Sequence, residues 1–210
     1  SATTAAVGAY AVTANGSSLT VSSVAVSGST VVLTLASAVA QGESLTVAYT
    51  DPTAGNDANA LQDSTGNDAP TLSATAITNN STVDRTAPTF VSAATNTAGT
   101  TVTLTYSEAL SATTATTSAF SVMVDGVSRS VSSRSISGST VVLTLASAIV
   151  SGQSVTVAYT DPTGGNDASA VQDASGNDAA SLPATSVTNN STVDATAPTF
   201  VSAATNTAGT

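Results

Sequence analysis

Apolar and polar residues alternate over several short stretches of the chain. Val102, Leu104 and Tyr106 are separated by threonines, and the same alternation recurs at 120–124, 141–145 and 155–159. Successive side chains of a β-strand point to opposite faces of a sheet. This period of two therefore predicts short strands, each with one buried face.

Turn-forming residues separate these stretches. Asp125 and Gly126 follow one stretch, and the sequence SGST at 137–140 precedes another; both favour tight turns. No stretch has a helical apolar stripe with caps, although SATTATTSA (111–119) has room for one short turn. Roughly seven short strands, with turn signals every 8–12 residues, are typical of an immunoglobulin-like sandwich. We therefore predict an all-β fold of immunoglobulin-like β-sandwiches.

An internal repeat organises the whole chain. SGSTVVLTLAS starts at Ser27 and Ser137, TVAYTDPT at Thr46 and Thr156, NNSTVD at Asn79 and Asn189, and APTFVSAATNTAGT at Ala87 and Ala197. Every offset is 110 positions, so residues 1–100 are a near copy of residues 111–210. Such regular self-similarity is the sequence signature of a repeat architecture. We expect tandem sandwiches of about 110 residues each.

The junction NNSTVD-x-TAP suggests where one repeat ends and the next begins. It predicts a complete repeat at 85–194, preceded by a repeat at 1–84 that lacks its first strands. Residues 195–210 would be the leader strand of a following repeat. A lone strand cannot bury its apolar face, so this leader is expected to fray unless another strand pairs with it.

Composition and charge exclude several classes of function. The formal net charge is −10, without a basic patch, which argues against binding to nucleic acid or anionic membranes. The chain has no cysteine and no histidine, so disulfides, thiol catalysis and histidine chemistry are absent. No apolar run approaches the ~20 residues that cross a bilayer. We expect neither nucleic-acid binding nor membrane insertion.

Five segments resemble a known class of repeats: DATAPTFVSAATNTAG, TVTLTYSEAL, SGSTVVLTLAS, VTVAYTDP and VQDASGNDA. They look like the repeats of very large bacterial cell-surface proteins, best known from cyanobacteria and associated there with swimming motility. They are also similar to immunoglobulin-like repeats of S-layer proteins and giant adhesins. The resemblance implies a secreted, extracellular scaffold at the cell surface and identifies no single ligand.

A duplicated acidic run is the main candidate for a site. TDPTAGNDANALQDSTGND spans 50–68, and a near copy spans 160–178. Calcium takes six to eight oxygen ligands, so clustered Asp and Asn residues could hold it. The spacing fits no EF-hand, however, and Asp and Asn also favour turns for local reasons. The candidate ligands are Asp51, Asp57, Asp63 and Asp68, with Asp161, Asp167, Asp173 and Asp178 in the second copy.

The junction between repeats is a second candidate for calcium. Asp84 and Asp194 lie just before TAP, and Glu108 ends a predicted strand. A calcium ion held by these acids would stiffen the link between repeats, as junction calcium does in many adhesin arrays. The alternative is a plain linker whose proline fixes an extended entry. Calcium is the one cofactor that the sequence leaves open.

The sequence gives little support for catalysis. Paired carboxylates can hydrolyse glycosides, but four tyrosines, three phenylalanines and no tryptophan would line a sugar cleft poorly. The many serines have no histidine to activate them. We predict that the chain is not an enzyme.

Assembly is the expected function. The chain has no lysine, the usual guard of exposed strand edges, so its edges are expected to be covered or used. Partners would be neighbouring copies of the repeat, stacked within a chain or paired strand to strand between chains. We predict a surface fibre or an adhesin stalk. The alternative is a module that binds a carbohydrate or a surface through its Asp/Asn-rich loops, but those loops are nearly as repetitive as the strands.

Overall fold

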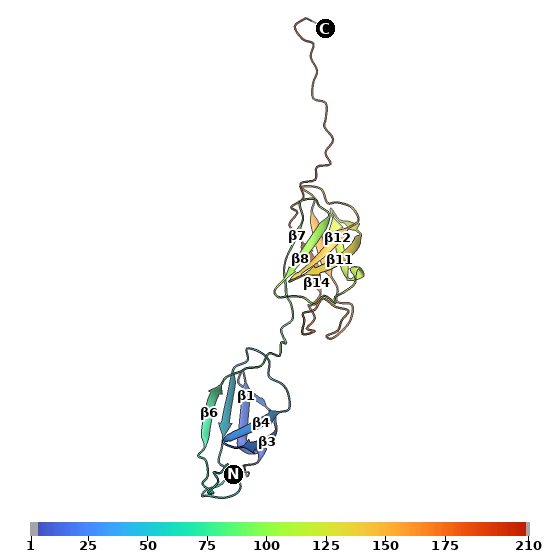
Figure 1. Cartoon of the computed structure of the whole chain (residues 1–210). Helices are drawn as coiled ribbons and strands as arrows, with labels where there is room; N and C mark the ends of the chain where they lie inside the picture. The colour runs from blue at the N-terminus through green and yellow to red at the C-terminus, as the bar shows by residue number, and fades with distance from the viewer. Residues whose placement is uncertain (1–3, 209–210) are drawn as a thin grey trace. The chain divides into compact units, whose positions relative to one another are not determined.

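The structure, a computed structural model, describes residues 4–208 and divides the chain into two compact units. Unit 1 is Ser1–Arg85 and unit 2 is Thr86–Thr210, so the division falls one residue from the predicted junction. Figure 1 shows strands in both units, and the helical elements among residues 4–208 are two 3-10 turns. The prediction of an all-β chain is confirmed. Residues 1–3, at the start of the first predicted segment, and residues 209–210, at the end of the third, lie outside the described residues.

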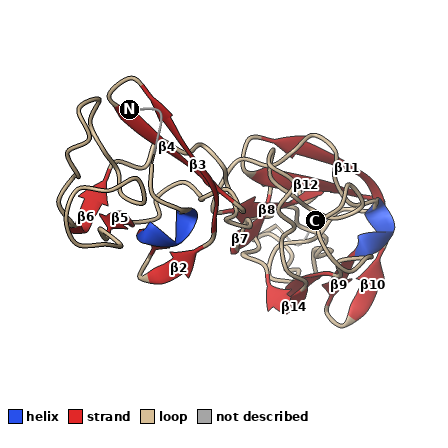
Figure 2. Ribbon diagram, turned by 90° about the horizontal axis from the view of Figure 1, so that it is seen from below, coloured by secondary structure: helices blue, strands red, loops and turns tan. Residues whose placement is uncertain are grey.

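Within residues 86–208, unit 2 forms two antiparallel sheets of four strands each. The first has the order β10-β9-β13-β14, with β9 at Phe120–Val124, β10 at Val127–Arg129, β13 at Val155–Tyr159 and β14 at Leu182–Ser186. The second has the order β11-β12-β8-β7, with β7 at Phe90–Thr95, β8 at Thr101–Tyr106, β11 at Val131–Ser137 and β12 at Thr140–Leu145. Figure 2 shows strands of both sheets in this unit.

The apolar faces of these two sheets share one core. Val102 and Leu104 of β8 are fully buried, as are Val122 of β9 and Leu143 of β12. Strands β8 and β12 alternate between buried and half-buried residues along their whole length. The four stretches predicted from period-two alternation are therefore strands β8, β9, β12 and β13, and that prediction is confirmed.

The predicted turns also form. Asp125 and Gly126 join β9 to β10 with φ of 51° and 78°, the left-handed pair that a two-residue hairpin turn requires. The short helical turn expected within 111–119 is a 3-10 turn, η2, at Thr117–Ala119.

Unit 1 repeats this arrangement with one sheet cut short. One sheet has the order β2-β1-β5-β6, with β1 at Tyr10–Ala14, β2 at Ser17–Leu19, β5 at Leu45–Tyr49 and β6 at Leu72–Ile77. Among the residues described in unit 1, the other sheet holds just β3 at Val21–Ser27 and β4 at Thr30–Leu35. A 3-10 turn, η1, spans Val7–Ala9. These elements precede their counterparts in unit 2 by 110 positions, except that β6 extends one residue further at its end than β14 does.

The shorter sheet leaves the apolar side chains of unit 1 less covered. Strand β4 has the same sequence as β12, TVVLTL, yet it alternates between half-buried and exposed residues. Leu33 is half-buried, whereas its counterpart Leu143 is fully buried. The difference arises because β8 packs beside β12, and no described residue of unit 1 takes that place beside β4.

Residues 195–208 contain no strand. Their sequence from 197 onward copies the segment that forms β7, but Phe200 and Val201 are 82% and 89% exposed. This is the behaviour expected of a strand that has no partner strand to cover it. Within residues 4–208, no helix is long and apolar enough to cross a membrane.

Candidate functional site

Both copies of the acidic run form the loop that links the last two strands of a sheet. Residues 50–68 lie between β5 and β6, and residues 160–178 lie between β13 and β14. The backbone N–H of Asp51 donates to Thr71 Oγ1 at 3.1 Å, and that of Asp161 donates to Ser181 Oγ at 2.9 Å. The two loops therefore begin with the same closure onto the segment that leads into the next strand.

A buried tyrosine fixes the middle of each loop to the sheet. The hydroxyl of Tyr49 accepts a hydrogen bond from the N–H of Leu61 at 2.9 Å, and that of Tyr159 accepts one from Val171 at the same distance. Burial raises the pKa of Tyr159 to about 12, so its hydroxyl stays protonated at neutral pH. Sequence analysis missed these anchors, although a tyrosine directly before TDPT in both copies is a usable signal.

A single aspartate organises the turn at the end of each loop. Asp173 Oδ1 accepts from the N–H groups of Ser175 at 2.8 Å and Asn177 at 2.9 Å, and its Oδ2 accepts from Asn177 Nδ2 at 2.8 Å. In unit 1, Asp63 accepts the matching bonds from Thr65 and Asn67, at 2.8 to 2.9 Å. Each carboxylate is thus used to close a turn of its own loop.

The remaining acids of the runs also bind backbone N–H groups. Asp57 Oδ1 accepts from Asn59 N at 2.8 Å, and Asp167 Oδ1 accepts from Ser169 N at 2.7 Å. The N–H of Asp167 donates to Asp178 Oδ2 at 2.8 Å, which links the two ends of the loop. The same link in unit 1 joins Asp57 N to Asp68 Oδ2 at 3.2 Å.

These contacts shift the pKa values of the carboxyl groups. For Asp63, hydrogen bonds from Asn67 and then Thr65 hold the pKa far below its ordinary value. For Asp173, burial pushes the pKa up, but the hydrogen bonds from Asn177 and Ser175 outweigh burial and lower it. Hydrogen bonding to the ionised form is what favours the charged state.

The pKa of Asp178 is shifted in the opposite direction. Burial raises its pKa, against the hydrogen bond from the N–H of Asp167. Its Oδ1 is buried and has no hydrogen-bond partner among the described residues. Asp178 also lines a cavity of about 230 Å³ with Pro88, Phe90 and Leu182.

The predicted calcium ligands of the runs do not converge. Among residues 4–208, no three carboxylates of one run have ligand atoms within 4.8 Å of one another. Within unit 2, a carboxylate oxygen of Glu108 does lie within 4.8 Å of one of Asp173. The bridge between Leu110 and Asp173 brings the two segments together. Sequence analysis assigned Glu108 and Asp173 to different candidate sites, so it did not anticipate this pair.

The other junction acids end the two complete copies of NNSTVD. Asp84 is the last residue but one of unit 1. Asp194 is exposed, and its Oδ1 accepts a hydrogen bond from the N–H of Thr196 at 2.7 Å. Asp194 therefore caps a turn at the start of the extended segment 195–208. A calcium site at the junction stays a prediction.

Comparison with known proteins gives one informative match. No curated protein matches the chain. A solved structure, the crystal structure of the N-terminal part of the bacterial S-layer protein SbsC, is 21% identical with a TM-score of 0.40. The match covers 49% of this chain and 23% of that one, and a likeness this weak carries no argument here.

The family profile described as "Putative flagellar system-associated repeat" matches residues 1–54 and 83–164, which is more than half of the chain. The two matched segments cover parts of both units, in keeping with the internal repeat. The resemblance to surface repeats associated with swimming is thereby confirmed at the level of a repeat family. The chain belongs to the family of flagellar system-associated repeats.

Proposed function

We propose that this chain is a structural module of an extracellular tandem-repeat protein, forming part of a surface fibre or the stalk of a giant adhesin. Membership of a repeat family supports this role. The absence of histidine and cysteine from the sequence supports a role without catalysis. The module would hold other parts of the protein at a distance from the cell and would associate with other copies of the repeat.

We further propose that each repeat of about 110 residues is an immunoglobulin-like sandwich. Two antiparallel sheets with a shared core in unit 2 support it. The spacing of 110 positions between matching strands of the two units supports the repeat length. A rod of such sandwiches would owe its length to repetition, since each repeat contacts only its neighbours.

The observation that carries the proposal is the common architecture of the two acidic loops. Tyr159 and Asp173 make the same hydrogen bonds within their loop as Tyr49 and Asp63 make within theirs. The carboxylates of Asp63 and Asp173 are occupied with N–H groups of their own loops. Loops conserved in shape between copies suit a scaffold better than a recognition surface.

The test is the location of the protein on cells that produce it. Antibodies raised against the full chain should decorate extended structures on intact cells in immunogold electron microscopy. Labelling that needs cell lysis would contradict the proposal. Binding of the full chain to a glycan array, lost in both Asp57→Asn and Asp167→Asn, would favour the carbohydrate-binding alternative instead.

A calcium-dependent role has one specific observation in its favour, the Glu108–Asp173 pair of carboxylates. Like charges at this distance repel each other, and a divalent cation would relieve the repulsion. We propose Glu108 and Asp173 as two of the ligands of such an ion. That Asp84 is a calcium ligand stays a prediction.

Thermal unfolding of the full chain with millimolar calcium or with excess chelator tests this role. Calcium bound only by the folded state should raise the midpoint of unit 2 by mass action. Glu108→Gln should abolish the shift, whereas Asp194→Asn, a matched loss of one acid, should keep it. A midpoint that calcium does not move contradicts a metal site here.

A further inference from the structure

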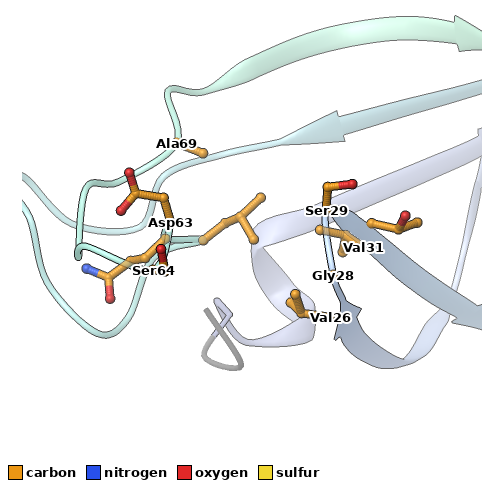
Figure 3. Close-up of a pocket in the computed structure, with 10 residues that line it drawn as sticks. Val26, Gly28, Ser29, Val31, Asp63, Ser64 and Ala69 are labelled. Atoms are coloured by element: carbon orange, nitrogen blue, oxygen red, sulfur yellow. The ribbon is translucent and has the colours of Figure 1, made fainter.

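Most differences between the two copies of the repeat lie in residues 6–26 and 39–45 and their counterparts. The turn between β3 and β4 and the acidic loop, which Figure 3 shows around a pocket in unit 1, are more alike: Gly28, Ser29 and Asp63 recur 110 positions later. The two divergent segments contain β1 and the start of β5, which pair with each other. The copies therefore differ mainly where one hairpin meets the strand beside it.

A polar pair of side chains joins these segments in unit 2. Asp125 Oδ1 accepts a hydrogen bond from Ser154 N at 2.9 Å. Gln153 Oε1 accepts one from Val150 N at 2.8 Å. The two remaining side-chain atoms face each other, and Gln153 Nε2 donates to Asp125 Oδ2 at 2.9 Å. The pair thus ties the turn between β9 and β10 to the segment that leads into β13.

In unit 1 the acid and the amide have exchanged places. Asn15 and Glu43 stand at the matching positions. Asn15 Oδ1 accepts from Ser44 N at 3.0 Å, and Glu43 Oε2 accepts from Ala40 N at 2.7 Å. The backbone N–H groups thus use the same two oxygen atoms as in unit 2. What remains is the NH₂ group of Asn15 and one carboxylate oxygen of Glu43, again a donor and an acceptor.

A hairpin from one unit and a β5-type strand from the other would bring like groups together. Asp125 with Glu43 would place two carboxylate oxygens, both acceptors, against each other. Asn15 with Gln153 would place two NH₂ groups against each other, because the backbone donors hold both amide oxygens. The turn position itself accepts few other residues, since its φ is 50° in unit 1 and 51° in unit 2.

A buried apolar pair next to the polar one differs in the same reciprocal way. Ala14 of β1 is opposite Leu45 of β5. At the matching positions of unit 2, Val124 of β9 is opposite Val155 of β13. All four side chains are at most 8% exposed. Val124 against Leu45 would crowd the core, and Ala14 against Val155 would leave a gap in it.

We propose that the polar pair and the apolar pair together form a pairing code, which makes each hairpin (β1–β2 or β9–β10) join the β5-type strand of its own repeat. Tandem copies with near-identical sequences are prone to exchange strands while they fold. The code opposes exchange because the wrong partner meets a mismatch in charge and in volume. This inference goes beyond the proposed surface role, and labelling of cells does not test it.

A double-mutant cycle in unit 2 of the full chain tests the polar part of the code. Gln153→Glu should lower the thermal midpoint of unit 2 by roughly 2–5 °C, because two carboxylates then meet. Asp125→Asn should lower it too, because two NH₂ groups then meet. The double variant has the combination found in unit 1 and should regain most of the loss. Losses that simply add would overturn the complementarity.

Disulfide trapping after refolding tests exchange itself. The chain has no cysteine, so Thr13→Cys and Thr156→Cys provide its two thiols. In the structure Thr13 pairs with Thr46, and Thr156 pairs with Met123, each within its own unit. The two thiols come directly opposite each other when β1 pairs with β13, with Cβ atoms about 4.5–5.5 Å apart.

The comparison is between the native code and a matched code. Four substitutions give unit 1 the code of unit 2: Ala14→Val, Asn15→Asp, Glu43→Gln and Leu45→Val. After refolding from denaturant, the matched chain should form the disulfide, within or between chains, at least about fivefold more than the native chain. Ala11→Cys in place of Thr13→Cys is the control, since its thiol would lie on a diagonal about 7–8 Å away and should crosslink little. Equal yields with the native and matched codes would overturn the inference.

Discussion

At the scale of single residues, two buried tyrosine hydroxyls of unit 2 differ in what they bind. Tyr159 accepts a hydrogen bond from Val171 N, whereas Tyr106 has no partner for its hydroxyl among the described residues. Removing the acceptor leaves a buried N–H unpaired, which costs about 1–3 kcal/mol. We predict that Tyr159→Phe lowers the free energy of unfolding of unit 2 by that amount, measured by denaturant titration of the full chain.

Tyr106→Phe is the matched control for this substitution. It removes the same atom from the same core, but the lost hydroxyl is buried without a partner, so its desolvation is relieved. We expect the stability of unit 2 to be unchanged or increased. If both substitutions destabilise unit 2 equally, the hydrogen bond from Val171 does not anchor the acidic loop.

The acids of the second loop predict an unusual dependence of stability on pH. The pKa of Asp173 is lowered in the folded state, so the stability it contributes is present above the unfolded value of about 4. That stability is lost as the pH falls through the folded pKa. The pKa of Asp178 is raised, so its contribution is present below about pH 4 and is lost as the pH rises through its folded pKa.

We therefore predict that unit 2 gains stability as the pH is lowered from 7 toward about 4 and loses it below that. Denaturant midpoints measured across this range check the prediction. Asp178→Asn removes the titrating group while keeping the size of the side chain, and should flatten the rise above pH 4. An unchanged rise in this variant would assign the effect to other acids.

At the scale of elements, the hairpin between β7 and β8 depends on one glycine. Gly99 has a φ of +66°, and a Cβ there would collide with the backbone of Ile149 and meet Ser191 Oγ at 2.9 Å. The carbonyl of Gly99 also accepts a hydrogen bond from Ile149 N at 2.8 Å. The close approach, more than the turn itself, therefore requires glycine at this position.

We predict that Gly99→Ala destabilises unit 2 by about 2–4 kcal/mol, the sum of backbone strain and displacement of the neighbouring loop. Gly152→Ala is the control, since Gly152 has a φ of +81° but open space around it. It should cost about 1 kcal/mol from strain alone. Equal losses in the two variants, measured by thermal unfolding, would mean that the contact with Ile149 relaxes freely.

The sequence predicted those strands whose apolar face is unbroken. Strand β11 escaped prediction because Arg134 occupies an inward position, where its guanidinium donates to the carbonyls of Thr114 and Ala115. Strand β14 is short and contains Pro183, which a strand tolerates only at an edge. Local alternation cannot reveal such strands, because their place depends on partners far along the chain.

The sequence predicted where the acidic loops lie, but not which groups their aspartates bind. Sequence analysis identified the acidic loops, yet spacing alone could not distinguish ligands of a metal from caps of a turn. Asp63 and Asp173 close turns of their own loops, and only coordinates show the donors around them. The difference in burial between β4 and β12, which share one sequence, was beyond sequence reasoning, because it follows from the pairing of β12 with β8.

At the scale of the whole molecule, the two units differ in how much core they possess. The core of unit 2 contains residues of both sheets, from Ala93 to Val187. In unit 1 the buried apolar cluster of described residues is Ala5, Tyr10 and Tyr49, with partly buried side chains around it. Because buried apolar area is the main source of stability, unit 1 should unfold more easily than unit 2.

We predict two separate thermal transitions for the full chain, the lower one from unit 1. Val12→Ala and Val122→Ala are the same substitution at matching positions of β1 and β9, and both side chains are buried. Val122→Ala should cost unit 2 about 2 kcal/mol. Val12→Ala should cost unit 1 less, because the hollow beside Val12 already reduces its contacts.

Val12→Ala should shift only the lower transition and Val122→Ala only the upper one. A single transition that both substitutions lower equally would instead show that the two units unfold together.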